Sequence, residues 1–152
     1  AIPYALFDRS VSHATYEQQE NGKVVLDGVI AMARACLEND IPVGLGTDTG
    51  CPYVTHYDMW RELCYFVKYC GVTPAFALHS ATLLNARLAG IDSVTGSVEA
   101  GKAADLVVCD KDPLADLSVL RSLHMVIKDG VRIEHPAVKK LPEVERELDK
   151  FL

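Results

Sequence analysis

A single short apolar run, residues 43–47 (V-G-L-G-T), constrains the possible folds of this chain more than any other feature. It follows a predicted amphipathic helix and ends at a polar loop that begins D-T-G at residue 48. A helix that leads into a buried strand, which then opens into a polar loop, is typical of one half of a parallel α/β unit. The 152 residues offer no second parallel strand as convincing. The chain therefore cannot by itself close an eight-stranded barrel, which needs about 250 residues.

The predicted elements of the first 90 residues are mainly helical. Residues 1–23 are expected to form one strand end and a long loop. The helix before residue 43 is expected to bury one face, made of Leu26, Val29, Ile30, Ala33 and Leu37. Two further amphipathic helices are predicted over about 57–70 and 73–87. The second of these begins at Thr73-Pro74, a capping hydroxyl followed by proline at the first helical position.

The pattern changes to strands and turns after Gly90. We expect a strand and turn over 96–101, a buried strand over 105–110, and a hairpin around Asp129-Gly130. A short amphipathic C-terminal helix docked on the body is predicted from Leu141, Val144, Leu148 and Leu152. The predicted organisation is an α/β part over 1–90, a β part over 91–136 and a C-terminal helix over 137–152.

Composition and charge exclude several classes of partner. Lys and Arg number 15 against 21 Asp and Glu, so the net charge is −6, and no basic block would bind nucleic acid or an anionic membrane. No apolar run reaches the roughly 18–20 residues that span a bilayer. The five cysteines form no C-x-x-C pair and lie among apolar neighbours. They are expected to be core residues in a reducing compartment, which favours a cytoplasmic protein.

Asp48 is the first candidate for chemistry, because sites in parallel α/β proteins gather where strands end. Its carboxylate could bind a metal, act as a general base, or cap the turn with its own side chain. His56 lies eight residues further on and could reach the same opening, although it could equally be a structural histidine. The other histidines show no H-x-H or H-E-x-x-H spacing.

A succession of motifs links these residues to a known family. The first half contains G-L-G-T-D-T-G (44–50), His56, R-E-L (61–63), G-V-T-P (71–74), A-L-H-S-A-T (77–82) and N-A (85–86). The second half contains G-S-V-E-A-G-K-A-A-D-L-V-V (96–108), D-P-L-A-D (112–116) and V-I-K-D-G (126–130). In this order they resemble the C-terminal third of the metal-dependent amidohydrolase superfamily. The most similar branch contains Xaa-Pro dipeptidase-like enzymes and relatives of imidazolonepropionase.

The resemblance implies a (β/α)₈ TIM barrel with one or two divalent metals, often zinc, beside a small β-sandwich. Asp48 matches the aspartate after the eighth strand. In the family this residue binds the metal, takes a proton from the attacking water and passes it to the departing nitrogen. His56 matches a histidine that we assign to contact with the substrate or transition state. Lys102 and Asp105 belong to a motif whose implied role is structural, a tight turn that leads into a strand.

The other metal ligands of the family lie on strands that this chain does not contain. A catalytic zinc needs about three protein ligands, and only Asp48 is available here. We therefore expect a C-terminal fragment of a hydrolase of C–N (amide or peptide) bonds, inactive alone, with a small-molecule or dipeptide-like substrate. Its expected partner is the missing N-terminal part of the barrel or a second copy of the chain. The alternatives are a non-catalytic oligomerising module and a ring-amine deaminase of the same superfamily.

Overall fold

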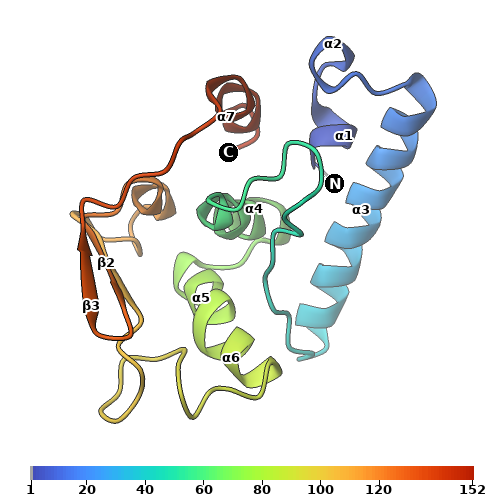
Figure 1. Ribbon diagram of the computed structural model, residues 1–152. Coiled ribbons are helices and arrows are strands. Elements are labelled where there is room, and N and C mark those ends of the chain that lie inside the picture. The colour runs from blue at the N-terminus through green and yellow to red at the C-terminus, as the bar shows by residue number, and fades with distance from the viewer. Residues whose placement is uncertain (1) are drawn as a thin grey trace.

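The computed structural model describes residues 2–152, and its central helices lie between a long N-terminal helix and a small sheet (Figure 1). The helices before the sheet are α1 (Ile2–Leu6), α2 (Arg9–Ser12), α3 (Tyr16–Glu38), α4 (Met59–Cys70), α5 (Pro74–His79), the π-helical turn η1 (Ser80–Leu84) and α6 (Asn85–Leu88). The later elements are β1 (Leu106–Val108), the 3₁₀ helix η2 (Leu117–Arg121), β2 (Met125–Lys128), β3 (Val131–Glu134) and α7 (Pro142–Asp149).

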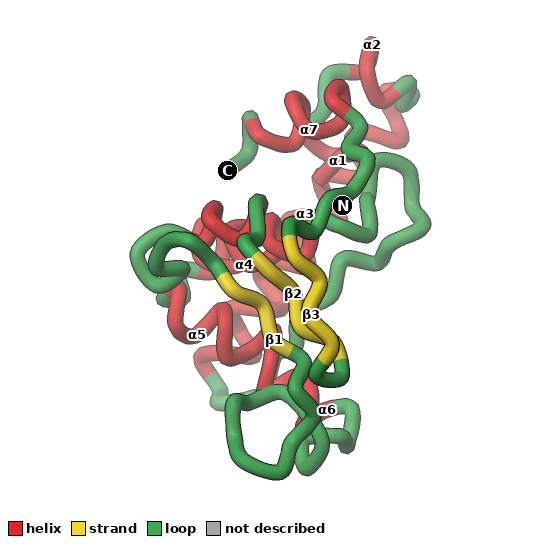
Figure 2. The backbone as a smooth tube through the Cα atoms, turned by 60° about the vertical axis from the view of Figure 1, so that its left-hand side comes forward, coloured by secondary structure: helices red, strands yellow, loops and turns green. Residues whose placement is uncertain are grey.

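The three strands form one antiparallel sheet in the order β1-β2-β3, seen in Figure 2 in front of the helices. Leu106 pairs with Ile127, and Val126 pairs with Ile133. The predicted hairpin is confirmed: Asp129 and Gly130 form its two-residue turn with φ of 50° and 80°. Positive φ at both positions is what a type I′ turn requires, and glycine adopts it without steric cost.

Two hydrophobic clusters hold the helices together. The first joins α1, α3 and α7 and contains Ile2, Ala5, Phe7, Leu26 and Leu148. The second joins α4, α5 and η2 through Leu63, Phe66, Ala77 and Leu117. Val43 and Leu45 pack against this second cluster, so the segment that precedes Asp48 lies on α4 and α5.

The predicted helices after residue 24 are confirmed. α4 buries Trp60 and Leu63 as its apolar stripe predicts. Thr73 caps α5, because its hydroxyl accepts a hydrogen bond from the Phe76 N–H at 3.2 Å. The helical path then continues through η1 and α6 to Leu88. One face assignment was wrong: Val29 of α3 is 57% exposed.

The prediction of a strand end and a long loop over residues 1–23 was wrong. α1, α2 and the first two turns of α3 occupy this stretch, and Ala1 lies outside the described residues. Thr15 and Gln18 form a capping box that starts α3, with the Gln18 side chain accepting from the Thr15 N–H at 2.8 Å. The polar run before Gly22 is therefore the solvent-facing start of a helix, which polarity alone does not distinguish from a loop.

Residues 43–47 do not form the predicted strand, and neither do residues 96–101. A strand exists only where a neighbour completes its hydrogen-bond ladder, and within residues 2–152 no strand lies beside 43–47. In the second segment Gly96 and Gly101 both have φ of 92°, which bends the backbone into turns. Both segments are extended or turning chain, not sheet.

The C-terminal elements are shorter than predicted. β1 covers only Leu106–Val108, and Val107 is more than half exposed, so this strand is not buried. α7 docks on the body through Leu148, but Leu141 and Leu152 lie outside the helix and are exposed. Every helix in the described part of the chain is too short or too polar to cross a membrane. The division at residues 90 and 136 stays a prediction.

Candidate functional site

The loop 48–58 connects the extended segment 43–47 to α4 and carries both predicted site residues. Asp48 begins the loop, with an exposed side chain and φ of 54°. Among the described residues its carboxylate makes only one hydrogen bond, a long one of 3.8 Å from the Cys51 thiol. Several other aspartates cap a turn by accepting from a backbone N–H, as Asp112 does from Leu114. Within residues 2–152 the Asp48 carboxylate accepts no hydrogen bond from a backbone N–H. The structure therefore does not support the alternative that Asp48 only caps its own turn.

His56 lies near the end of the same loop and is also exposed. Its ring meets the Tyr57 ring edge-on, with centroids 5.6 Å apart. The Tyr57 hydroxyl in turn accepts a hydrogen bond from the Leu141 N–H at 3.0 Å. No hydrogen bond or ion pair within residues 2–152 joins His56 to Asp48. The two predicted site residues share a loop, and the structure does not link them further.

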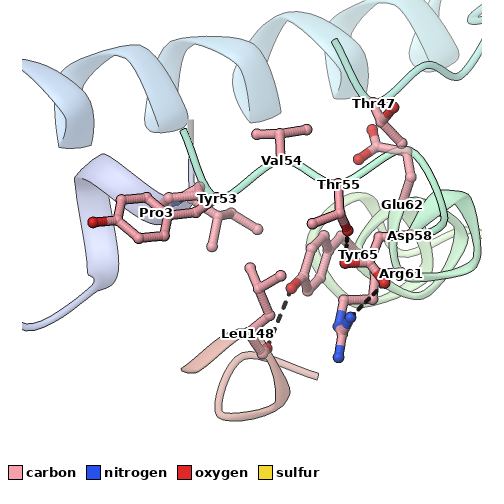
Figure 3. Close-up of a pocket in the computed structure, with 11 residues that line it drawn as sticks. Pro3, Thr47, Tyr53, Val54, Thr55, Asp58, Arg61, Glu62, Tyr65 and Leu148 are labelled. Carbon is pink, nitrogen blue, oxygen red and sulfur yellow. Dashed lines mark hydrogen bonds and ion pairs between the residues drawn. The ribbon is translucent and has the colours of Figure 1, made fainter. Parts of the chain in front are cut away.

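A cavity of about 90 Å³ lies behind this loop, between α4, the N-terminal segment and α7 (Figure 3). Its polar lining comes from Thr47, Thr55, Asp58, Arg61, Glu62 and Tyr65. Thr47 directly precedes Asp48, so one wall of the cavity is continuous with the candidate site. Ile2, Pro3, Tyr53, Val54 and Leu148 supply its apolar side.

Glu62 places a second carboxylate beside the loop, facing the same cavity as Thr47 (Figure 3). It is half-buried and makes no hydrogen bond or ion pair within the described chain. Burial raises the pKa of this carboxyl above its ordinary value, because the charged form loses solvation. Burial also raises the pKa of the Tyr65 hydroxyl, which donates to the Leu148 carbonyl. Perturbed groups of this kind gather at functional sites and also in structural networks.

Arg61 anchors the far end of the loop. Its side chain is almost completely buried, and its guanidinium binds Asp58, the last residue of the loop, at 2.6 Å. The same guanidinium binds Glu145 and Asp149 of α7. Arg121 adds a second cation to Glu145 and Asp149 at 2.9 and 3.0 Å. Hydrogen bonds and nearby carboxylates raise the pKa of Arg61 despite the opposing effect of burial, so this residue stays charged.

The donor groups that the structure describes do not complete a metal site. Within residues 2–152, no three His, Cys, Asp or Glu side chains lie close enough together to hold an ion. His124 and His135 have rings 6.2 Å apart, but His124 is paired with Asp110 at 2.9 Å next to the sheet.

Sequence reasoning did not identify Arg61 or Glu62 as residues that line the cavity. Both belong to the R-E-L motif, for which no chemistry was predicted. The spacing of Asp58 and Arg61, three residues apart on a helix start, is one signal of an ion pair. Nothing local indicates that Glu145, 84 residues away, completes the cluster.

Comparison with known proteins gives a consistent result. The model of the family described as "Amidohydrolase family" matches residues 10–133. The structure of a candidate prolidase from Bifidobacterium longum is 41% identical with a TM-score of 0.94, covering 98% of this chain and 37% of that one. A Xaa-Pro dipeptidase structure with bound methionine is 36% identical with a TM-score of 0.63, covering 70% of this chain and 25% of that one.

The curated proteins agree with the structures. The imidazolonepropionase of Picrophilus torridus is 31% identical over 101 residues, which is 66% of this chain and 25% of that protein. The chain thus spans about a quarter of this relative and 37% of the Bifidobacterium protein.

Proposed function

Because this chain belongs to the amidohydrolase family, we propose that it forms the C-terminal part of a metal-dependent hydrolase of C–N bonds. The observation that carries the proposal is the family match over residues 10–133, which includes the whole loop 48–58. The similarity to a candidate prolidase and to a Xaa-Pro dipeptidase favours a dipeptide-like substrate with an amide bond. The parent fold is then a TIM-type barrel, and β1, β2 and β3 are part of a small β-sandwich beside it.

Asp48 is proposed as the metal ligand and proton carrier, and His56 as the residue that contacts the substrate. Within residues 2–152 the exposed Asp48 carboxylate accepts only the long Cys51 bond, so it is available to an ion. Zinc, when bound, would lower the pKa of water to about 7 and polarise the amide carbonyl. The Asp48 carboxylate oxygens are suited to accept one proton and return it to the departing nitrogen. His56 is exposed on the same loop, where it can meet a substrate.

The partner in this proposal is the remaining, N-terminal part of the barrel. The segment 43–47 has no partner strand among the described residues, and a row of apolar side chains lies exposed on α3; both features support a missing neighbour. Val25, Val29 and Met32 lie at helical spacing and are 54%, 57% and 69% exposed. Exposed apolar rows of this kind usually mark an interface. A second copy of the chain could also cover this row, which is the non-catalytic alternative.

Experiments on the purified 152-residue chain test whether its site is incomplete without the N-terminal part of the barrel. We expect substoichiometric zinc by metal analysis and no hydrolysis of Xaa-Pro dipeptides or N-acyl amino acids. Size measurement by light scattering then separates the two partners, since a monodisperse oligomer favours the non-catalytic module. Stoichiometric zinc together with turnover would contradict the proposal that the site is incomplete. Release of ammonia from a ring amine by a completed enzyme would indicate the deaminase alternative.

A cytoplasmic location is part of the proposal. All five cysteines are unpaired thiols, and burial raises the pKa of Cys64, Cys70 and Cys109, which lowers their reactivity. Cys51 is exposed, so the prediction that all five cysteines are core residues was wrong. Unpaired thiols nevertheless suit a reducing compartment.

A further inference from the structure

The side-chain amide of Asn85 pairs with both backbone polar groups of Leu45. Its Oδ1 accepts from the Leu45 N–H at 2.9 Å, and its Nδ2 donates to the Leu45 carbonyl at 2.8 Å. A primary amide presents a donor and an acceptor side by side, as the edge of a neighbouring strand does. Asn85 thus gives the extended segment 43–47 the partner that no strand among the described residues provides.

Gly44 makes this close approach possible. A Cβ at this position would lie 2.5 Å from the Asn85 Oδ1 and 2.9 Å from the Leu88 Cδ1. Gly44 does not have a positive φ, so its lack of a side chain matters for space and not for backbone freedom. Any larger residue at 44 would push the Asn85 amide away from Leu45.

The helix changes from α-helical to π-helical geometry just before Asn85. η1, a π-helical turn, covers Ser80–Leu84 and ends directly before Asn85. A π turn accommodates one extra residue, which rotates the following side chains by about 100° relative to a continuous α-helix. Asn85 therefore faces Leu45 from a position that the pattern of a regular helix does not give. Single π turns are often found next to functional sites.

We propose that Asn85 is a positioning residue for Asp48. Leu45 lies three residues before Asp48, and the Asn85 pair fixes the backbone from which the loop 48–58 begins. The positioning requires the space left by Gly44, so the two residues act as one unit. The role in hydrolysis rests on the proposed function, whereas the effect of Asn85 on the Asp48 backbone does not.

Amide hydrogen exchange and NMR of the 152-residue chain test the inference. In Asn85→Ala we expect exchange at the Leu45 N–H to rise by about fivefold or more, the range of one lost hydrogen bond. The Asp48 amide and carboxyl resonances should shift in the same variant. Asn39→Ala is the matched control, because Asn39 also donates through Nδ2 to a carbonyl, that of Ala35, at 2.8 Å, but at the C-terminal end of α3. This control should leave Leu45 and Asp48 unchanged.

Two further variants, Gly44→Ala and the double variant Gly44→Ala/Asn85→Ala, test whether the two residues act as one unit. Gly44→Ala should reproduce the effect of Asn85→Ala, and combining the two should add little, because both remove the same pair. If Asn85→Ala does not fold, Asn85→Asp is the variant to measure. It keeps an acceptor for the Leu45 N–H, so this amide should retain most of its protection from hydrogen exchange. Unchanged exchange at Leu45, or Asp48 resonances that move equally in Asn39→Ala, would overturn the inference. Failure of the proposed hydrolysis would leave these NMR results unaffected, so the two claims fail separately.

Discussion

Arg61 on α4 and Glu145 on α7, 84 residues apart in the sequence, form a buried ion pair with two contacts of 3.1 and 3.2 Å. The Trp60 ring lies under the same guanidinium, with its centroid 4.5 Å from the Arg61 Cζ. Because Arg61 also binds Asp58 at the end of the loop 48–58, this pair connects the candidate site to the C-terminal helix.

Removing the Arg61 charge should destabilise the whole chain. Arg61→Met leaves the buried Asp58 carboxylate without its cation and removes one of the two cations of Glu145, and breaking a buried pair in this way typically costs about 3–5 kcal/mol. Urea denaturation measures the free energy of unfolding. Lys23→Met is the matched control, since its pair with Glu20 is exposed and worth less than about 1 kcal/mol. Equal losses in the two variants would show that the cluster does not hold α7.

Asp149 gives the stability of α7 a defined pH dependence. Burial alone would raise the pKa of Asp149, but hydrogen bonds from Arg61 and Arg121 outweigh it and lower this pKa below the ordinary 3.8. A carboxyl with a lowered pKa stabilises the fold above that ordinary value, and the contribution disappears as the pH falls through the folded-state pKa. Asp149→Asn should therefore be less stable than the wild type at pH 7, with the difference closing below about pH 4.

Thermal unfolding across pH 3–7 measures this difference. Asp27→Asn, an exposed change on α3, serves as the control and should show no such closing. A deficit of Asp149→Asn that stays constant down to pH 3 would mean that its ion pairs do not stabilise the fold.

Removing the charge of Glu62 should have the opposite effect on stability at pH 7 from removing that of Asp149. Burial raises its pKa above the ordinary 4.5, so the ionised form opposes folding at neutral pH. Glu62→Gln should raise the free energy of unfolding at pH 7 and have little effect below about pH 4, where the wild-type carboxyl is protonated in both states. Denaturant unfolding at the two pH values is the measurement, with the exposed Glu134→Gln as control. A loss of stability at pH 7 would indicate that Glu62 has a favourable partner in its charged form.

Local signals predicted much of the helical and hairpin structure. Thr73-Pro74 and Asp129-Gly130 carry their geometry in adjacent residues, so α5 and the β2–β3 turn could be read from the sequence. Residues 43–47 could not, because a strand forms only beside a partner strand, and no strand lies beside this segment within residues 2–152. The start of α3 at Tyr16 depends on the Thr15 capping box and on packing against α1, where a Cβ at Gly22 would meet the Ala5 nitrogen at 3.0 Å.

The candidate site was predictable only in part. The family motifs point to Asp48 and His56, and these roles stay predictions. The pairing of Asn85 with Leu45, 40 residues away, requires both the space at Gly44 and the π turn before Asn85. Neither feature has a local sequence signal, and the Arg61 cluster likewise depends on tertiary contacts.

The central claim is that this chain supplies an essential carboxylate, Asp48, to a hydrolase site completed by other residues. The most direct measurement uses a chimera in which the aligned 37% of the Bifidobacterium longum protein is replaced by this chain. Hydrolysis of an Xaa-Pro dipeptide is measured for the chimera and for its Asp48→Asn and Asp27→Asn variants. We predict that the chimera is active, that Asp48→Asn lowers kcat by about 10²–10⁴-fold, and that Asp27→Asn has no effect. An Asp48→Asn chimera as active as its parent would contradict the account.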